Sequence, residues 1–156
     1  MLEWKKSEAA VVLSVIAFIG VISWYQVILG EMKTRDAQRK ADVEMVSRGL
    51  NKYYLDYKTF PMEATEGGKM IACGYQGREV CEWDGGPVVD EDGVVYINKL
   101  PNDPFHPKGY RYVYTVNESR TAFRIYISLE NRTDKDYKKD LTQTCGNNVQ
   151  CSWYVE

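Results

Sequence analysis

Histidine is almost absent from this sequence, which limits the catalytic and metal sites that the chain is able to form. The single histidine among 156 residues is His106, between Phe105 and Pro107. One imidazole without a neighbouring nucleophile or a second histidine matches neither a hydrolase site nor a typical metal site. Acidic residues are plentiful, but no spacing singles out a carboxylate pair. We therefore predict that the protein is not an enzyme, and we expect no cofactor and no metal ion.

A surplus of positive charge is also lacking. The chain contains 20 Lys and Arg residues against 22 Asp and Glu residues, which gives a net charge of −2. The basic residues are interleaved with acidic ones, so they create no strong field of one sign. We predict no specific nucleic-acid partner.

A long segment near the N-terminus contains neither proline nor charged residues. The first proline is Pro61, and no charged residue occurs from Ala9 to Gly30. These about 22 residues would form a helix roughly 33 Å long, which is enough to cross a bilayer. The run is longer than the apolar region of a cleaved secretion signal, and Val27-Ile28-Leu29 makes a poor cleavage site. We interpret it as a retained transmembrane helix, since the rest of the chain is too small to cover such a helix inside a soluble protein.

The helical pattern continues beyond this span. Apolar residues recur there on one face of an amphipathic helix: Val43, Val46, Leu50, Tyr53, Tyr54 and Tyr57. Pro61 is predicted to end the helix, because the residue before a proline is disfavoured in the helical conformation. The predicted organisation is a flank at 1–8, a transmembrane helix half at 9–30, an amphipathic half at 31–60 and a globular β domain at 61–156.

Cysteine is scarce, but its four copies form two local pairs, Cys73 with Cys81 and Cys145 with Cys151. We predict these two disulfides because local closure loses the least chain entropy, with crossed pairings as the alternative. A zinc site is disfavoured, since neither pair has C-x-x-C spacing and His106 is distant in sequence. Disulfides indicate an oxidising compartment, so the C-terminal part is expected outside the cytoplasm. Basic residues lie on both sides of the span, so the positive-inside rule does not decide the orientation of the helix in the membrane.

Alternating patterns predict a small antiparallel sheet in the C-terminal part. Two hairpins are expected, Val88–Asp90 with Val94–Ile97 and Tyr110–Val116 with Ala122–Leu129, the second with one buried face. The glycine-rich segment Met62–Gly86 is interpreted as a loop-rich connection. The polar run 133–140 is expected to be solvated, and the tail 142–156 is expected to fold back on the sheet. The fold class is therefore α+β.

Two Asn-X-Ser/Thr triplets begin at Asn117 and Asn131. Such triplets accept sugar in some hosts, but they occur often by chance. The sequence therefore predicts only that both asparagines lie at the surface. The acidic turn Asp90–Asp92 lacks the EF-hand pattern and is interpreted as a hairpin tip.

Four blocks, in this order along the chain, resemble the type IV pilin and type II secretion pseudopilin family. They are Glu8 before the apolar run, Arg35–Asp42, Leu50–Tyr57 leading to Phe60-Pro61, and Leu100–Pro104 shortly before Tyr110–Tyr114. The resemblance implies a long N-terminal helix packed on an antiparallel sheet, with the helices bundled in the core of a filament. The sequence differs from the family in Glu3, where the family has the glycine that precedes the processing site.

The resemblance further implies a structural subunit of a type IV pilus-like or pseudopilus filament. Its partners would be copies of itself, other pilin-like subunits, membrane lipid and the inner-membrane assembly machinery. The residues expected to act in assembly are Glu8, Lys5, Lys6, Arg35, Asp36 and Arg39. Glu8 would pair with a cation of the next subunit, either its N-terminal amine or a lysine, and the charged block would set the register between neighbouring helices.

The alternative is an unprocessed single-pass membrane protein. Its extracytoplasmic domain would then present exposed tyrosines, such as Tyr126 and Tyr137, to a binding partner. Tyrosine suits this role because it offers a large contact area at a low loss of conformational entropy.

Overall fold

The computed structural model describes residues 6–65 and 67–156. The chain divides into two compact units, Met1–Thr34 and Arg35–Glu156. This boundary lies a few residues beyond the predicted end of the transmembrane half at residue 30. Lys5 lies outside the described residues, and the side chain of Lys6 is likewise not described.

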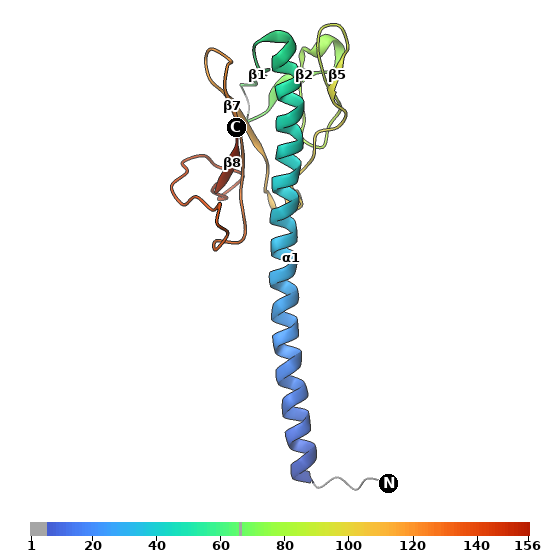
Figure 1. Ribbon diagram of the computed structural model, residues 1–156, viewed down its shortest axis with the longest axis vertical. Coiled ribbons are helices and arrows are strands. Elements are labelled where there is room, and N and C mark those ends of the chain that lie inside the picture. Colours follow the sequence, from blue (N-terminus) through green and yellow to red (C-terminus); the bar gives the residue numbers. More distant parts are fainter. Residues whose placement is uncertain (1–5, 66) are drawn as a thin grey trace. The chain divides into compact units, whose positions relative to one another are not determined.

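Helix α1 runs from Lys6 to Tyr57 (Figure 1), so the two predicted helix halves belong to one element. The prediction that Pro61 ends the helix was inaccurate, because the helix stops earlier. Lys58 adopts a left-handed conformation with φ 57°, and its N–H donates to the carbonyl oxygen of Tyr54 at 2.8 Å. This single bond from the residue after the helix to its last turn is a common way to terminate a helix.

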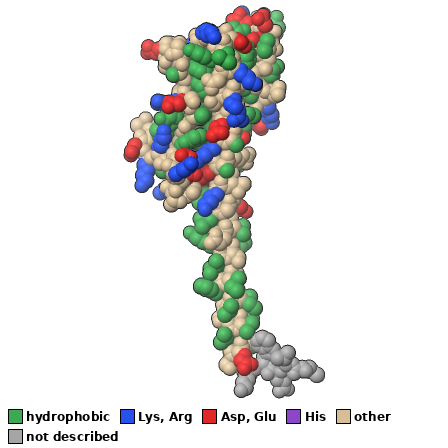
Figure 2. Space-filling model, in the orientation of Figure 1, with side chains coloured by type: hydrophobic (Ala, Val, Ile, Leu, Met, Phe, Trp, Pro, Cys, Tyr) green, Lys and Arg blue, Asp and Glu red, His purple; other side chains and the backbone are tan. Residues whose placement is uncertain are grey.

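In the first unit, α1 exposes its apolar side chains (Figure 2). Val11 is 63% exposed, Phe18 67% and Trp24 71%. The most apolar window of the helix has a mean hydropathy of 2.2, and none of it is buried within the chain. Length and composition make this the one candidate membrane span among the described residues.

The second unit adds short antiparallel strands to the C-terminal part of α1. A three-stranded sheet contains β1 (Met62–Glu63), β2 (Met70–Cys73) and β3 (Glu79–Val80). A hairpin pairs β4 (Val88–Val89) with β5 (Val95–Ile97), and a second three-stranded sheet has the order β6 (Val113–Val116), β7 (Phe123–Ile127), β8 (Trp153–Val155). Two short 3-10 helices complete the unit, η1 (Tyr75–Gly77) and η2 (His106–Lys108). The α+β prediction is confirmed.

Both predicted hairpins are present, although their strands are shorter than expected. In the longer one, Val113 pairs with Tyr126 and Val116 with Phe123. The tail folds back as predicted, because Tyr154 of β8 pairs with Tyr126 of β7.

One expectation about the sheets was wrong, and a second was incomplete. Met62–Gly86 is not only a connection, since it contains β1, β2 and β3, whose two to four residues are too short to show an alternating pattern. The predicted face of the β6–β7 hairpin is buried, with Tyr114 and Ile125 fully so, but part of the opposite face is covered as well. Val113 points away from the main core and is only 3% exposed, because the Cys145–Cys151 loop covers it.

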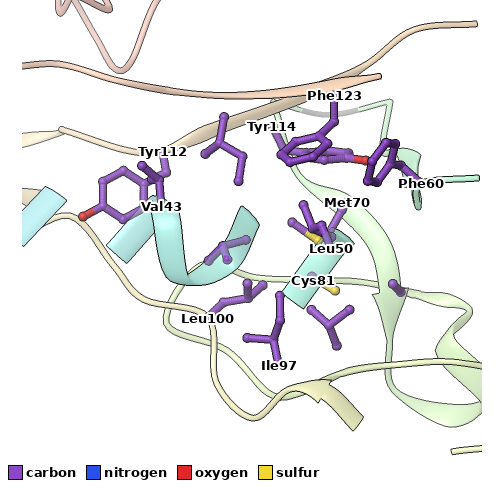
Figure 3. Packing of buried hydrophobic residues seen from close by; sticks show 14 of the residues in the cluster. Val43, Leu50, Phe60, Met70, Cys81, Ile97, Leu100, Tyr112, Tyr114 and Phe123 are labelled. Carbon is purple, nitrogen blue, oxygen red and sulfur yellow. The ribbon is translucent and has the colours of Figure 1, made fainter. Parts of the chain in front are cut away.

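The main core joins α1 to the inner face of the sheet formed by β6, β7 and β8 (Figure 3). Val43, Val46 and Leu50 are fully buried, as the amphipathic pattern predicted, and they belong to one cluster with Tyr114 and Ile125. The side chains of the predicted face are less buried toward the end of the helix, where Tyr53 and Tyr54 are half-buried and Tyr57 is 36% exposed.

Gly49 brings the helix close to strand β5. A Cβ at this position would collide with the side chain of Ile97 and would lie 3.1 Å from the carbonyl oxygen of Tyr96. A residue without a side chain is therefore required there, although glycine weakens a helix by about 1 kcal/mol relative to alanine.

A fragment that begins at Lys33 is expected to be soluble and folded. It keeps all of the second unit with its buried helix face, and it loses the exposed apolar segment. Circular dichroism and a cooperative unfolding transition in denaturant check this expectation. Aggregation of the fragment, or loss of cooperativity, would show that the second unit depends on the first.

Candidate functional site

Glu8 lies in the first turn of α1 and is exposed. An acidic residue is favoured at this end of a helix by the helix dipole alone, which provides a role for Glu8 that needs no partner subunit. The predicted pairing of Glu8 with Lys5 or Lys6 of another subunit involves side chains outside the described part of the chain. It therefore remains a prediction.

The other predicted assembly residues meet around Arg39, whose side chain is fully buried. The Arg39 guanidinium binds Asp103 through two hydrogen bonds, Nε to Oδ2 at 2.8 Å and Nη2 to Oδ1 at 3.1 Å. Its Nη1 donates to Asp36 Oδ1 and to Glu130 Oε1, each at 2.7 Å. Three carboxylates from three separate segments thus converge on one guanidinium, whose planar shape suits paired contacts with carboxylates.

Asp36 and Arg35 attach the same turn of α1 to the segment after β7. The carboxylate of Asp36 accepts the backbone N–H of Glu130 at 2.9 Å and that of Asn131 at 2.8 Å. Arg35 donates to both carboxylate oxygens of Glu130, at 2.9 and 2.7 Å. The guanidinium of Arg35 also lies 4.3 Å from the centre of the Phe105 ring, within the range of a cation–π contact.

These contacts give Asp36 and Arg39 a role within their own chain, and the assembly role predicted for them stays a prediction. A side chain that sets the register between subunits must reach a neighbour, whereas Asp36 is 2% exposed and Arg39 has no exposed surface. Both act within their own chain by fixing α1 to the loops around Asp103 and Glu130. Arg35, with 23% of its side chain exposed, retains some surface.

The polar run 133–140 is also more ordered than predicted. Lys40 Nζ binds Asp134 at 2.8 Å and Asp136 at 2.7 Å, and Tyr137 packs against the main core. Although burial works against the charge of Lys40, the hydrogen bonds from this lysine to both aspartates raise its pKa. The run is therefore fastened to α1 and is not freely solvated.

The ionic contacts of Glu130 make stability depend on pH. Burial alone would raise the pKa of Glu130, but hydrogen bonds from Arg35 and Arg39 outweigh it and hold that pKa below its usual range. A carboxyl group with a lowered pKa stabilises the fold above its unfolded pKa of about 4.3, and this contribution is lost as the pH falls through the folded value.

We therefore expect the free energy of unfolding to decrease as the pH is lowered from about 5 toward 3. Asp134, whose pKa is lowered by its hydrogen bond from Lys40, acts in the same direction. Burial raises the pKa of Asp42, which acts in the opposite direction. Denaturant titrations at several pH values measure the slope. The Glu130→Gln variant should show a shallower slope, and an unchanged slope would assign the acid sensitivity to other groups.

The predicted disulfides are both present, joining Cys73 to Cys81 and Cys145 to Cys151. The first links β2 to the residue after β3, and the second closes the loop that covers Val113. Crossed pairings are excluded by this arrangement.

Within the described ranges, 6–65 and 67–156, we looked for side chains placed to form a metal site or a nucleophile–base pair. No group of three or more His, Cys, Asp or Glu residues there is placed to hold a metal ion. His106 lines a pocket of about 310 Å³ together with Trp83 and Arg111. No nucleophile–base pair is formed by His106, since none of the hydrogen bonds described for the chain involves its imidazole.

The sequence did not identify Asp103 and Glu130 as members of the arginine cluster. Asp103 lies in the block Leu100–Pro104 that carries part of the family resemblance, so a signal for it existed. Glu130 follows a predicted strand, and its neighbours in the sequence form no motif that would mark it as a partner of Arg39. Only the folded chain brings it to Arg39, which is distant from it in sequence.

No model of a known protein family, no characterised protein and no solved structure matches this chain. The described residues form an α+β fold in which a buried ionic cluster fixes the loops to α1, and they contain one candidate membrane span.

Proposed function

We propose that this protein is a structural subunit of a type IV pilus-like or pseudopilus filament. The observation that carries the proposal is the exposed apolar segment of α1, which has no buried residue in its most apolar window. Such a surface is stable in lipid or against other apolar surfaces, and it is not stable in water. Lipid is one environment that stabilises this surface. The order of the family-like blocks along the chain indicates that copies of the same helix are the other.

In this proposal, assembly moves the helix from one apolar environment to another. The segment 9–30 anchors the subunit in the membrane, and the domain with its two disulfides lies outside the cytoplasm. Extraction into a filament then replaces lipid contacts by helix contacts. The ionic cluster around Arg39 supports this process by keeping the domain attached to its own helix.

Replacement of Glu8 by glutamine is expected to reduce filament or oligomer yield sharply. A carboxylate beside an apolar segment is unfavourable unless it is hydrated or paired, and a bundle of staggered helices provides a cation from the next subunit. Glutamine keeps the size and hydrogen bonding of Glu8 and removes its charge, so membrane insertion and domain folding should be unchanged. Electron microscopy of sheared surface material measures the yield.

Glu31 serves as the matched control, since it is an acidic residue of the same helix on the other side of the apolar segment. The Glu31→Gln variant should assemble like the wild type. Wild-type assembly by the Glu8→Gln variant, at equal expression, would remove Glu8 from the mechanism.

The intact mass of the membrane protein separates the proposal from the single-pass alternative. A mature chain that begins near Trp4, or a filament that contains this subunit, supports the filament proposal. An unprocessed chain that stays in the membrane without forming filaments supports a binding domain at the cell surface.

A further inference from the structure

The two Asn-X-Ser/Thr triplets differ in structure much more than in sequence. Asn117 is exposed and occupies the turn between β6 and β7, while Asn131 is half-buried in the segment after β7. We propose that Asn131 is an acceptor for an N-linked sugar and that Asn117 is not. The proposal rests on the extracytoplasmic placement of the domain and goes beyond a role in a filament.

The side-chain amide of Asn117 is fully used within its own turn. Its Nδ2 donates to Ser119 Oγ at 2.9 Å and to Thr121 Oγ1 at 3.2 Å. Its Oδ1 accepts the backbone N–H groups of Thr121 at 2.8 Å and Ala122 at 3.0 Å. A sugar on Nδ2 would replace one of its two hydrogens and open the turn. Asn117 is therefore a structural residue of the hairpin.

Asn131 has the opposite arrangement. Its Oδ1 accepts the backbone N–H of Thr133 at 3.1 Å and the Thr133 hydroxyl at 2.7 Å. Within the described residues, Nδ2 of Asn131 donates no hydrogen bond, and no side-chain nitrogen or oxygen there is buried without a partner. The amide nitrogen is therefore unbonded and not fully buried.

The backbone of this segment holds the acceptor in place. The N–H of Asn131 donates to Asp36 Oδ2 at 2.8 Å, and its carbonyl oxygen accepts the N–H of Asp134 at 3.1 Å. Asn131 is partly buried through these contacts. A sugar on Nδ2 would leave them intact, since none of them uses the amide nitrogen.

The same geometry favours the chemical step. Nδ2 would attack C1 of a sugar carried on a lipid diphosphate, forming the N–C bond while the C1–O bond breaks and the lipid diphosphate leaves. The Nδ2 proton passes to a carboxylate base of the transferase. As nitrogen loses this proton, negative charge moves to Oδ1, where the two donors from Thr133 stabilise it.

The test uses the purified full chain in detergent with its disulfides intact. The chain is incubated with a lipid-diphosphate oligosaccharide and membranes that contain an oligosaccharyltransferase, and its intact mass and peptide map are then measured. A short Asn-X-Thr peptide in the same reaction verifies the enzyme. We expect one added oligosaccharide, located on Asn131, and its loss in the Asn131→Gln and Thr133→Ala variants at an unchanged unfolding midpoint.

Ser119→Ala is the matched control, since it destroys the other triplet and keeps the bonds of Asn117 to the backbone. This variant should be modified like the wild type. Sugar on Asn117, equal sugar on both sites, or no sugar while the peptide is modified would each overturn the proposal. None of these outcomes depends on filament assembly, so the two proposals fail separately.

Discussion

Replacement of Leu50 by aspartate is expected to destabilise the second unit by about 4 kcal/mol or more. Leu50 is fully buried on the face of α1 that packs against the second sheet. The substitution removes apolar contacts and places a charge in a cluster of buried apolar side chains. Truncation of a buried leucine alone typically loses about 2–5 kcal/mol. Denaturant unfolding of the fragment that begins at Lys33 measures the loss.

Leu55 supplies the matched control on the same helix. It is 67% exposed, so the Leu55→Asp variant has the same change in composition without burial of the charge. Its stability should stay within about 1 kcal/mol of the wild type, which allows for the unfavourable position of an acid near a helix C-terminus. Equal midpoints for both variants would mean that the face with Leu50 is not the packed one.

Replacement of Arg39 by methionine is expected to lower the free energy of unfolding by about 3–5 kcal/mol. Methionine retains an apolar stem of similar length but removes the hydrogen bonds to Asp36, Asp103 and Glu130. Asp36 and Asp103 are both nearly fully buried. Their carboxylates would then lack their charge partner, and an unpaired buried charge is the main source of the loss.

Arg124 provides the comparison for Arg39. Its side chain is 48% exposed and pairs with Glu156, which is 61% exposed. Solvent and salt screen such a pair, so the Arg124→Met variant should unfold at the wild-type midpoint. A double-mutant cycle with Arg39→Met and Asp103→Asn should show coupling of about 0.5–3 kcal/mol. Additive effects of the two substitutions would contradict a direct interaction between these side chains.

The buried ionic cluster also shows what the sequence leaves open about the block Arg35–Asp42. The block Arg35–Asp42 stands out in the sequence as a mixed-charge stretch between apolar patterns, and charges of that kind are usually solvated or shared with a partner. In the folded chain, Arg39 meets Asp103 and Glu130, which are contributed by distant loops. Periodicity locates a residue on a helix, but it does not reveal which loop covers that position.

The sequence alone determined the features that depend on local patterns. A long uncharged run predicts a membrane-length helix, a period of 3.6 residues locates the buried Val43, Val46 and Leu50, and closely spaced cysteines predict the two disulfides. In each of these cases the physical cause acts between residues that are near in sequence, so the pattern itself contains the information.

Tertiary structure alone decided which polar groups are buried and paired. It placed Glu130 against Arg39, arranged the short strands of Met62–Gly86 into a sheet, and covered Val113 with the Cys145–Cys151 loop. It also distinguished two similar triplets, because the amide of Asn117 closes a turn while the amide nitrogen of Asn131 is unbonded within the described residues and not fully buried. Such outcomes depend on contacts between segments far apart in sequence, where the direction of each side chain and the path of each loop decide the partner.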